Sequence, residues 1–414
     1  MVPVVILTLL FTLTCAAVII LLAFGLKRLL TRDGEPDKGG VTEPGGLADH
    51  RGGSSMDAGG IRVSVVVPFR DEEKEIPGLI DDLFTQTYPE EYFEVLLVND
   101  HSTDGSKEIL LKALEGKKSF RLLDLPEGIR GKKAALGFGI SRAAGKWILQ
   151  TDADCRLRPG FLAARMAHLA RNPSDLSAGF VTVGKRGDGF TQIFERLDLL
   201  SLSASGAGSF KLGRPLMCSG ANLLYSRELY WNTRSFDPEG SIPSGDDMFL
   251  MIGARRLGRS VSFCTDPETL VETAPAGSLP VLLRQRIRWA SKAPFYRMAD
   301  IQAIALLVAI TQLSMLLLPL WIVLFPGMWI WLTGAGILKA AADFYLLWVT
   351  TGLTSGRKDL LYFLPVSLFY YPFQLLVLAG SLMSRPAWKG RQSTHSKVCI
   401  SFSGQSPGNK PVRS

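Results

Sequence analysis

The hydrophobic pattern opens with an uncharged apolar run at residues 4–26. As one helix, a run of this length crosses the roughly 30 Å hydrocarbon core of a bilayer. A cleaved signal peptide fits it less well, because the run exceeds the usual apolar length, no basic residue precedes it and no small-residue cleavage site follows. Lys27, Arg28 and Arg32 come next, and basic residues prefer the cytoplasmic side, so the following segment is expected in the cytoplasm. We therefore predict a retained transmembrane anchor at residues 1–30.

Apolar segments return towards the end of the chain, near residues 301–325, 328–350 and 360–382. Between positions 301 and 350 the only charged side chains are Lys339 and Asp343. Residues spaced i, i+4 can pair on one helical face, which softens the roughly 2.5–3.5 kcal/mol cost of each charge inside a membrane. The pattern predicts a transmembrane region at residues 299–384 with two or three spans, and a turn at Pro326-Gly327.

The basic tail at residues 385–414 constrains the topology of this region. With three spans after a cytoplasmic domain, the tail's Arg385, Lys389, Arg391 and Lys397 would lie outside, against the usual preference of basic residues. Pro365 and Pro372 are expected to break the last apolar segment. A re-entrant or interfacial last segment would leave the tail in the cytoplasm.

The middle of the chain has the pattern of a soluble α/β domain. Residues 31–60 are rich in Gly, Pro, Asp and Ser, which predicts a flexible linker. Short apolar runs then alternate with amphipathic stretches. The predicted strands are Arg62–Val67, Phe93–Val98, Phe120–Asp124 and Trp147–Thr151, and the helices lie near 74–86, 104–115 and 131–144. This alternation predicts a mostly parallel sheet flanked by helices. We expect a cytoplasmic domain at 61–298, including an interfacial helix at 278–298.

The composition agrees with a membrane protein that carries a soluble-like domain. Of the 414 residues, 47% are hydrophobic and 20% are charged, against about 25% charged in ordinary globular chains. These figures exclude a plain cytosolic enzyme and an intrinsically disordered protein, and the charged middle of the chain excludes a polytopic channel. Five cysteines without a CxxC spacing indicate reduced thiols, with neither a disulfide framework nor a zinc site.

The net charge of +8 arises mainly from two segments. The tail from Arg385 carries six basic residues, the stretch 284–297 carries five, and neither contains an acid, so the remainder of the chain is slightly acidic. The basic residues are not interleaved with aromatic residues on one domain face, which argues against a nucleic-acid partner. The basic balance therefore indicates segments that flank a membrane.

Two carboxylates follow the fourth predicted strand, in the sequence Gln150-Thr151-Asp152-Ala153-Asp154. Residues i and i+2 of an extended chain share a face, so Asp152 and Asp154 can converge. A DxD alone is more often a solvated loop. Its place at the carboxyl end of a strand, where α/β sheets bind ligands, favours a site. Paired carboxylates suit Mg²⁺ or Mn²⁺ together with a substrate diphosphate.

Polar clusters also follow the first two predicted strands, in the sequences VPFRDEE from Val67 and VNDHSTDG from Val98. The second cluster supplies ordinary helix-capping residues, but Asp100 is close enough to the strand end to face a ligand. The sequence RGKK opens a helix and can bring Lys132 to a phosphate, although basic pairs are usually solvated. Polar groups at three strand ends predict one crevice.

Two motifs later in the chain carry further candidate chemistry. The sequence SGDDMFL from Ser244 begins a helix, where the helix dipole alone explains adjacent acids. A carboxylate held rigidly there also suits a catalytic base. In RQRIRW the spacing places Gln285, Arg288 and Trp289 on one helical face, which we expect to face the site. The basic residues expected to bind anionic headgroups instead are Arg284, Arg286 and Lys292.

Together and in this order, the motifs resemble those of family 2 glycosyltransferases, which are inverting enzymes with the GT-A fold, over about residues 61–298. VPFRDEE resembles the family's VPxxNE with Asp71 for Asn, and NDHSTD resembles DDGSTD with Asn99 for Asp and His101 for Gly. GKKAAL resembles GKAxAL, TDAD contains the DxD, and GDD stands where ED is common. QRIRW matches QxxRW in full, as in the membrane-bound cellulose, hyaluronan and poly-N-acetylglucosamine synthases. Ceramide glucosyltransferases carry a related motif.

The resemblance implies a UDP-sugar donor, a divalent cation (Mg²⁺ or Mn²⁺) and roles for individual residues. The nucleotide-sugar-binding residues would be Pro68, Phe69, Arg70, Glu72, Asp100, Lys132 and Asp152, and the metal would be held by Asp154 with Asp152. Asp247 would deprotonate the acceptor hydroxyl, whose attack on the anomeric carbon inverts the configuration. Gln285, Arg288 and Trp289 would close over the acceptor and the diphosphate. The acceptor side would be formed by Gly220, Ala221, Asn222 and Asp246.

The favoured function is sugar transfer to a lipid-linked or short glycan acceptor at the cytoplasmic face of the membrane. Three C-terminal segments offer little channel wall for a growing polymer, so a processive polysaccharide synthase is the alternative. A catalytically silent membrane-tethered protein is disfavoured, because every acidic position needed for the chemistry is present. A nucleotidyltransferase is disfavoured because VPFRDEE is not the Gly-rich basic loop that such enzymes carry after the first strand.

Overall fold

The computed structural model describes residues 2–33, 62–236, 245–354, 356–383, 387–388 and 391–392. Most of the predicted linker at 31–60 and of the predicted basic tail at 385–414 lies outside these residues, as does Ser244 of the SGDD motif. Cys15, Cys155, Cys218 and Cys264 are free thiols, as expected, and Cys399 lies outside the described residues.

The centre of the molecule is a seven-stranded sheet with the order β3-β2-β1-β4-β8-β6-β9. Its strands are β1 (Val63–Phe69), β2 (Phe93–Asn99), β3 (Phe120–Asp124), β4 (Trp147–Gln150), β6 (Leu176–Gly179), β8 (Leu223–Ser226) and β9 (Val261–Cys264). Only β8 runs antiparallel to its neighbours β4 and β6, and the other pairs are parallel. The predicted mostly parallel sheet is confirmed, and the four predicted strands are present with ends shifted by at most two residues.

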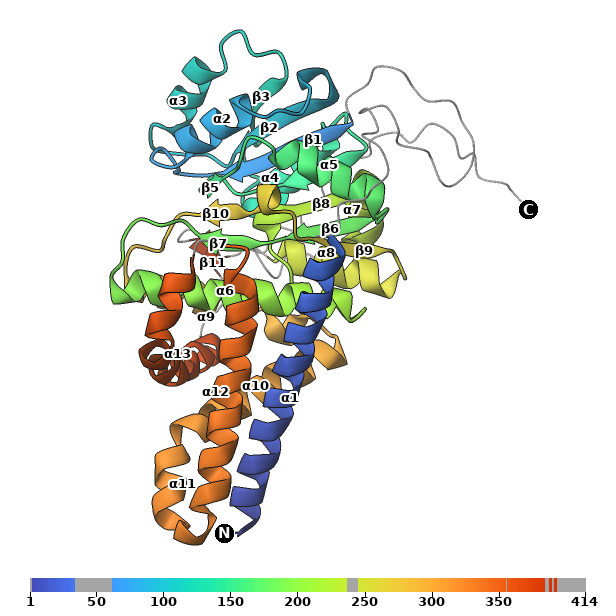
Figure 1. The fold of residues 1–414 in the computed structure, drawn as a ribbon. Helices are drawn as coiled ribbons and strands as arrows, with labels where there is room; N and C mark the ends of the chain where they lie inside the picture. The colour runs from blue at the N-terminus through green and yellow to red at the C-terminus, as the bar shows by residue number, and fades with distance from the viewer. Residues whose placement is uncertain are drawn as a thin grey trace, which may run out of the picture.

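Helices cover both faces of this sheet, and a smaller three-stranded sheet adjoins it (Figure 1). The helices of this part are α2 (Ile76–Phe84), α3 (Ser106–Ala113), α4 (Lys132–Ser141), α5 (Phe161–Arg171), α6 (Phe190–Lys211), α7 (Arg227–Thr233), α8 (Asp246–Arg256) and α9 (Leu279–Ala290). The small sheet has the order β5-β10-β7, with β5 (Cys155–Arg156), β7 (Val181–Val183) and β10 (Val271–Thr273). Short 3₁₀ turns are η1 (Glu90–Tyr92), η2 (Gly220–Asn222), η3 (Arg234–Phe236), η4 (Pro267–Thr269) and η5 (Ala293–Phe295).

The central strands are buried on both faces, which explains their nearly continuous apolar sequence. All seven residues of β1 are buried. Val66 faces one hydrophobic cluster, and Val65 and Val67 face the other, as the alternation of side chains along a strand requires. On the face of the sheet that carries Val66, helix α4 packs very closely. A Cβ added at Gly139 would lie 2.7 Å from a methyl carbon of Val66. This close packing holds α4 tightly against β1.

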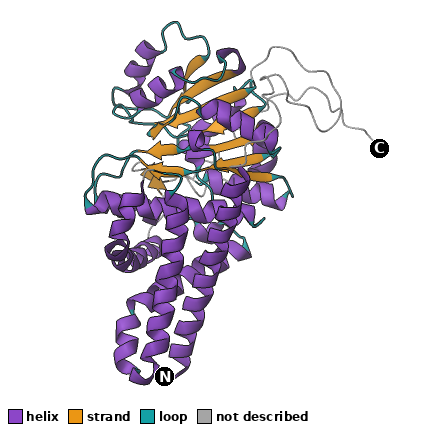
Figure 2. Cartoon of the chain, in the orientation of Figure 1, coloured by secondary structure: helices purple, strands orange, loops and turns teal. Residues whose placement is uncertain are grey.

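The remaining helices form a bundle on one side of the sheet domain (Figure 2). They are α1 (Val2–Asp33), α10 (Ala299–Leu316), α11 (Leu318–Leu324), α12 (Trp329–Thr351) and α13 (Phe363–Met383), with the 3₁₀ turns η6 (Pro326–Met328) and η7 (Gly356–Tyr362). Within the described residues, four segments are long and apolar enough to cross a membrane: Pro3–Thr31, Ala299–Leu316, Pro326–Thr351 and Gly356–Met383. A two-residue pair, β11 (Ala387–Trp388) with β12 (Arg391–Gln392), follows.

Two details of the predicted apolar segments differ in the structure. The run at 301–325 is two helices, because Pro319 lies in the first turn of α11 and a new helix starts there. The segment at 360–382 is not broken at its prolines, because α13 continues through Pro372. Figure 1 looks nearly along the axis of α13, whereas α1 and α12 run lengthwise in the same view. The proline expectation was therefore wrong, although α13 does cross the other long helices at a steep angle. The predicted pairing of Lys339 with Asp343 is confirmed.

Close helix packing attaches α1 to the sheet domain, and this gives a test of the fold. A Cβ at Gly208 of α6 would overlap the carbonyl oxygen of Leu22 in α1, whereas nothing lies within 4 Å of the same position at Gly334 in α12. Gly208→Ala should lower the thermal midpoint in detergent, because overpacking typically costs about 1–3 kcal/mol. Gly334→Ala, the matched control, should keep or raise the midpoint through helix propensity. Equal midpoints for the two variants would contradict the close α1–α6 contact.

Candidate active site

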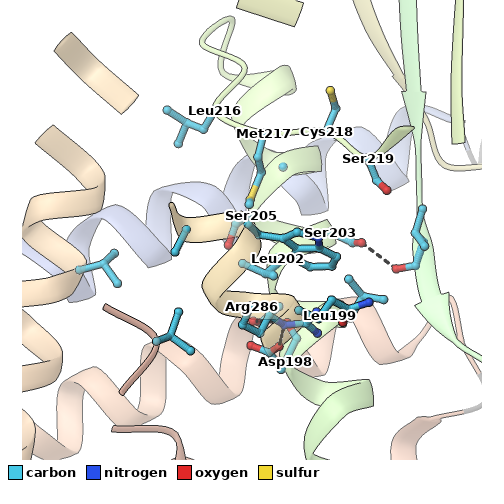
Figure 3. A pocket seen from close by; sticks show the side chains of 18 of the residues that line it. Asp198, Leu199, Leu202, Ser203, Ser205, Leu216, Met217, Cys218, Ser219 and Arg286 are labelled. Atoms are coloured by element: carbon cyan, nitrogen blue, oxygen red, sulfur yellow. Dashed lines mark hydrogen bonds and ion pairs between the residues drawn. The ribbon is translucent and has the colours of Figure 1, made fainter. Parts of the chain in front are cut away.

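One cavity of about 850 Å³ brings together most of the residues singled out in the sequence. Its lining includes Pro68, Arg70, Glu72, Lys132, Asp152, Asp154, Gly220, Ala221, Asp246, Asp247, Gln285, Arg288 and Trp289. These residues come from strand ends, from the starts of α4 and α8 and from α9. Figure 3 shows another part of its wall, where Leu202 and Ser205 of α6 lie opposite Met217 and Cys218. The crevice predicted at the carboxyl edge of the sheet therefore exists.

Three predicted site residues do not line this cavity. Phe69 is 1% exposed and packs in the hydrophobic core, because it points away from the cavity face of β1. Asn222 is completely buried, and its Nδ2 donates to the carbonyl oxygens of Phe180 and Thr269. Asp100 is also completely buried, and its carboxylate accepts from the N–H of Gly131 at 3.0 Å. Their observed contacts are structural, and that of Asp100 holds the turn that starts α4.

The two carboxylates of the DxD motif have different partners. Asp152 forms an ion pair with Lys132 at 2.5 Å, and Asp154 accepts a hydrogen bond from the Thr273 hydroxyl at 3.0 Å. Burial and then the neighbouring Asp152 raise the pKa of Asp154. Although burial opposes it, Asp152 and Asp246 raise the pKa of Lys132, so Lys132 stays charged. This carboxylate pair fits a divalent cation of the Mg²⁺ type, which commonly uses one or two carboxylates and completes its shell with phosphate oxygens and water.

The acidic pair at the start of α8 is electrostatically asymmetric. Gly245 precedes it with a φ of 97°, a left-handed conformation that glycine adopts without strain. Asp246 accepts from the amide of Gln150 at 2.5 Å, and despite burial Lys132 and this hydrogen bond lower its pKa. Burial and then the charge of Asp246 raise the pKa of Asp247. Backbone N–H groups hold the Asp247 carboxylate at both oxygens, those of Gly220 at 3.0 Å and Met248 at 2.8 Å. The pKa values of these two neighbouring acids are thus shifted in opposite directions.

Lys292 belongs to this cavity, contrary to the expectation that it binds lipid headgroups. Its side chain is 6% exposed, lines the cavity and packs beside Gly245 at the start of α8. Burial lowers its pKa to about 8, partly offset by Asp247. Burial also lowers the pKa of Arg288. The sequence signal for Lys292 was available, since it follows Trp289 by three residues and so lies on the same side of that turn.

Arg286 was also expected at the headgroups, and the structure buries it. It is 4% exposed and forms an ion pair with Asp198 of α6 at 2.6 Å (Figure 3). Its Nη1 donates to Gln285 Oε1 at 2.8 Å, and its guanidinium lies 4.3 Å from the centre of the Trp289 ring. Arg286 therefore joins α6 to two of the residues predicted to close over the substrates.

The loop after β2 explains one departure from the family pattern. His101 stands where that pattern has Gly, and its φ is 53°, in the left-handed region that Gly adopts most readily. Its Nε2 lies 3.0 Å from the carbonyl oxygen of Ile129, which ties this loop to the one before α4. The side-chain amide of Asn99 donates a hydrogen bond to the carboxylate of Asp124. The carboxylate of Asp71 accepts a hydrogen bond from the N–H of Thr103. The three residues that depart from the family pattern, Asp71, Asn99 and His101, therefore form hydrogen bonds at the carboxyl edge of the sheet.

Part of this chain is similar in sequence to known glycosyltransferases. Residues 64–234 match the family model described as Glycosyl transferase family 2. Glycosyltransferase AglE of Haloferax volcanii is 29% identical over 208 residues, 47% of this chain and 68% of that protein. An undecaprenyl-phosphate 4-deoxy-4-formamido-L-arabinose transferase of Yersinia pestis is 30% identical over 142 residues, 33% of this chain and 41% of that protein. The match to the second relative thus spans less than half of its length.

Two solved structures show the extent of structural similarity. One is the mannosyltransferase PcManGT from Pyrobaculum calidifontis in complex with GDP-Man and Mn²⁺, with 17% identity, coverage of 93% of this chain and 100% of that one, and a TM-score of 0.49. The other is S. aureus TarS 1-349 in complex with UDP-GlcNAc, with 17% identity, coverage of 77% and 92%, and a TM-score of 0.41.

The buried ion pair between Asp198 and Arg286 gives a prediction about stability. Arg286→Met should lower the free energy of unfolding by about 3–5 kcal/mol, because it leaves a buried carboxylate uncompensated. The double variant Arg286→Met/Asp198→Leu should recover most of this loss. The control is Lys107→Met, which removes an ion pair with Asp124 whose two side chains are 39% and 54% exposed and should cost no more than about 1 kcal/mol. Thermal unfolding in detergent measures all three, and a double variant as unstable as Arg286→Met would contradict the assignment.

Proposed function

Residues 64–234 form a family 2 glycosyltransferase domain, and on that premise we propose that this chain is a membrane-bound inverting glycosyltransferase. It moves a sugar from a UDP-sugar to a hydroxyl of a lipid-linked or glycan acceptor. The observation that carries the proposal is the asymmetric acid pair Asp246–Asp247 in the same cavity as the DxD carboxylates and the Gln285–Trp289 face of α9. An inverting transfer needs one base for the acceptor and a cationic environment for the leaving diphosphate.

The donor binds, in this proposal, along the edge formed by β1, β4 and the start of α4. Pro68 and Arg70, which line the cavity, would contact the nucleotide. Lys132 also lines the cavity, so it can contact a donor phosphate in addition to its ion pair with Asp152. Asp154, with Asp152, is the ligand pair for a divalent cation. When bound, such a cation supplies charge stabilisation to the departing diphosphate. Mg²⁺ and Mn²⁺ suit these oxygen ligands equally well by chemistry.

Asp247 is the proposed general base. Its raised pKa brings it nearer to the working pH, where a carboxylate accepts a proton from the acceptor hydroxyl most effectively. The hydroxyl oxygen then forms a bond to the anomeric carbon as the bond to the diphosphate oxygen breaks, which inverts the configuration. Arg288 and Lys292 are cations in the same cavity that can stabilise the negative charge of the leaving group.

The membrane side of the cavity supports a lipid-linked acceptor. The cavity continues between the long apolar helices, where Ile19 of α1, Val308 of α10, Leu346 of α12 and Val377 of α13 line it. Apolar walls of this kind suit a hydrocarbon chain, and a concave site of this volume can bury most of a ligand. The relative from Yersinia pestis is named for a lipid-phosphate acceptor.

We assign the location and the domain limits on the same basis. The proposed divisions are an anchor at 1–30, a linker at 31–60, the catalytic domain at 61–298, a transmembrane region at 299–384 and the basic tail at 385–414. Lys27 and Arg28 follow the anchor, which favours a cytoplasmic catalytic domain in a multi-pass protein. The steep crossing of α13 fits an interfacial helix, which would keep the basic tail in the cytoplasm (Figure 1).

Removal of either key carboxylate tests the proposal. Wild-type protein supplied with Mn²⁺ or Mg²⁺ and a panel of UDP-sugars, with membrane lipid extract as acceptor, should release UDP. Asp247→Asn should reduce the rate by about 10²–10⁴-fold as expected for a lost base, and Asp154→Asn should abolish it. Asp188→Asn, which alters a 70% exposed carboxylate outside the cavity, is the control. An unchanged rate with Asp247→Asn or Asp154→Asn would reject the assigned role of that residue.

The pH dependence of the transfer rate should reflect the titration of Asp247 and of Lys292. The rate should rise with pH through the pKa of Asp247, which lies above that of an ordinary aspartate, because only its deprotonated form accepts a proton. It should fall above pH of about 8, where Lys292 loses its charge. Lys292→Arg keeps a permanent charge and should remove that alkaline decline. A decline near the same pH in Lys292→Arg would exclude Lys292 as its cause.

A further inference from the structure

The part of the cavity that lies among the membrane helices is not uniformly apolar. Lys339 and Asp343 of α12 and Gln312 of α10 line the same cavity as the catalytic carboxylates. All three belong to helical segments that are long and apolar enough to cross a membrane. Polar side chains inside a membrane are costly and usually face a cavity or a functional site.

The ion pair presents its acidic member to the cavity. The side chain of Lys339 is 3% exposed, whereas that of Asp343 is 27% exposed, and the two are paired. Lys339 is therefore the covered member of the pair, and Asp343, which also lines the cavity, is the more accessible one. Since buried ion pairs can often be replaced by apolar residues without loss of stability, stability alone does not account for this one.

Gln312 provides a second, independent observation. Its side chain is 5% exposed, and its Oε1 has no hydrogen-bond partner among the residues that the structure describes. A buried amide oxygen without a partner carries a desolvation cost that a ligand N–H or O–H would remove. Like the Asp343 carboxylate, the Gln312 amide oxygen is a hydrogen-bond acceptor, so a ligand that binds here needs a hydrogen-bond donor.

We propose that this polar patch, formed by Asp343, Lys339 and Gln312, binds a hydroxyl or amide N–H of a lipid acceptor, in addition to the hydroxyl that receives the sugar. This proposal rests on the proposed function and names its acceptor class. An acceptor whose only polar group is a phosphate fits poorly, because a phosphate dianion has no hydrogen to donate and is repelled by the accessible carboxylate. The patch therefore selects neutral lipids with a second hydrogen-bond donor.

The probes are three lipids that differ in this chemistry. N-oleoylsphingosine has an amide N–H and two hydroxyls, 1,2-dioleoylglycerol has a single hydroxyl, and undecaprenyl phosphate is an anionic polyprenyl lipid. Purified full-length protein in detergent is labelled with a diazirine-bearing N-acylsphingosine, and each unlabelled lipid is used as a competitor. This readout needs no turnover. The KM for each lipid is measured separately with the UDP-sugar that supports UDP release.

N-oleoylsphingosine should compete about tenfold better than dioleoylglycerol, as expected for one additional buried hydrogen bond. Gln312→Leu should remove about that advantage and raise the KM for N-oleoylsphingosine by a similar factor, with the KM for the UDP-sugar unchanged. The double variant Lys339→Met/Asp343→Leu, which leaves no unpaired charge, should also weaken competition by N-oleoylsphingosine and raise its KM. The matched control is Gln302→Leu, an exposed glutamine on the same helix α10 that does not line the cavity.

The outcomes separate this proposal from the proposed function. Equal labelling of Gln312→Leu and Gln302→Leu, or strongest competition by undecaprenyl phosphate, would overturn the patch as a lipid site. If UDP release still depends on Asp247 in that case, the proposed function stands without the patch. If the lipid competes as expected but no UDP-sugar is consumed, the patch stands as a lipid site and the proposed function fails.

Discussion

The confinement of four carboxylates in one cavity is the constraint on which this site depends. Asp152 and Asp154 come from the end of β4, and Asp246 and Asp247 from the start of α8. Carboxylates held together away from water raise one another's pKa unless cations balance them. Lys132 balances part of this charge, because it pairs with Asp152 at 2.5 Å and lowers the pKa of Asp246. Asp154 and Asp247 are left with raised pKa values.

Further positive charge comes from α9, and this helix connects the cavity to the long apolar helices. Arg286 is paired with Asp198 of α6 and contacts Gln285 and Trp289, so α6 sets the position of the α9 face that lines the cavity. In turn α6 packs on α13, with the rings of Phe194 and Phe373 4.9 Å apart. The same set of helices therefore lines both the part of the cavity beside the acidic motifs and the part among the long apolar helices.

Local sequence pattern predicted the parts of this site that depend on chain periodicity. Short apolar runs located β1 to β4 because strands buried on both faces must be apolar throughout. The DxD and GDD acids were located because helix and strand ends at the carboxyl edge of a sheet are where ligands bind. Phe69 was misplaced because adjacent residues on an extended chain point to opposite sides, and a motif read as a block of residues does not distinguish the two sides. Asn222 lies in the 3₁₀ turn η2, and its burial depends on the distant carbonyl groups of Phe180 and Thr269.

The sequence alone determined the α/β class, the apolar helices, the order of the acidic motifs and the pairing of Lys339 with Asp343, because each depends on residues close together in the chain. Tertiary structure decided the rest. Whether Arg286 and Lys292 reach lipid headgroups or a buried site depends on α6 and α8, which lie far from them in sequence. Likewise, only the packing of α1, α10, α12 and α13 makes one cavity of the DxD and GDD acids and the polar residues of the long apolar helices. A charge in the sequence has no fixed environment until distant elements exclude water from it and supply its partner.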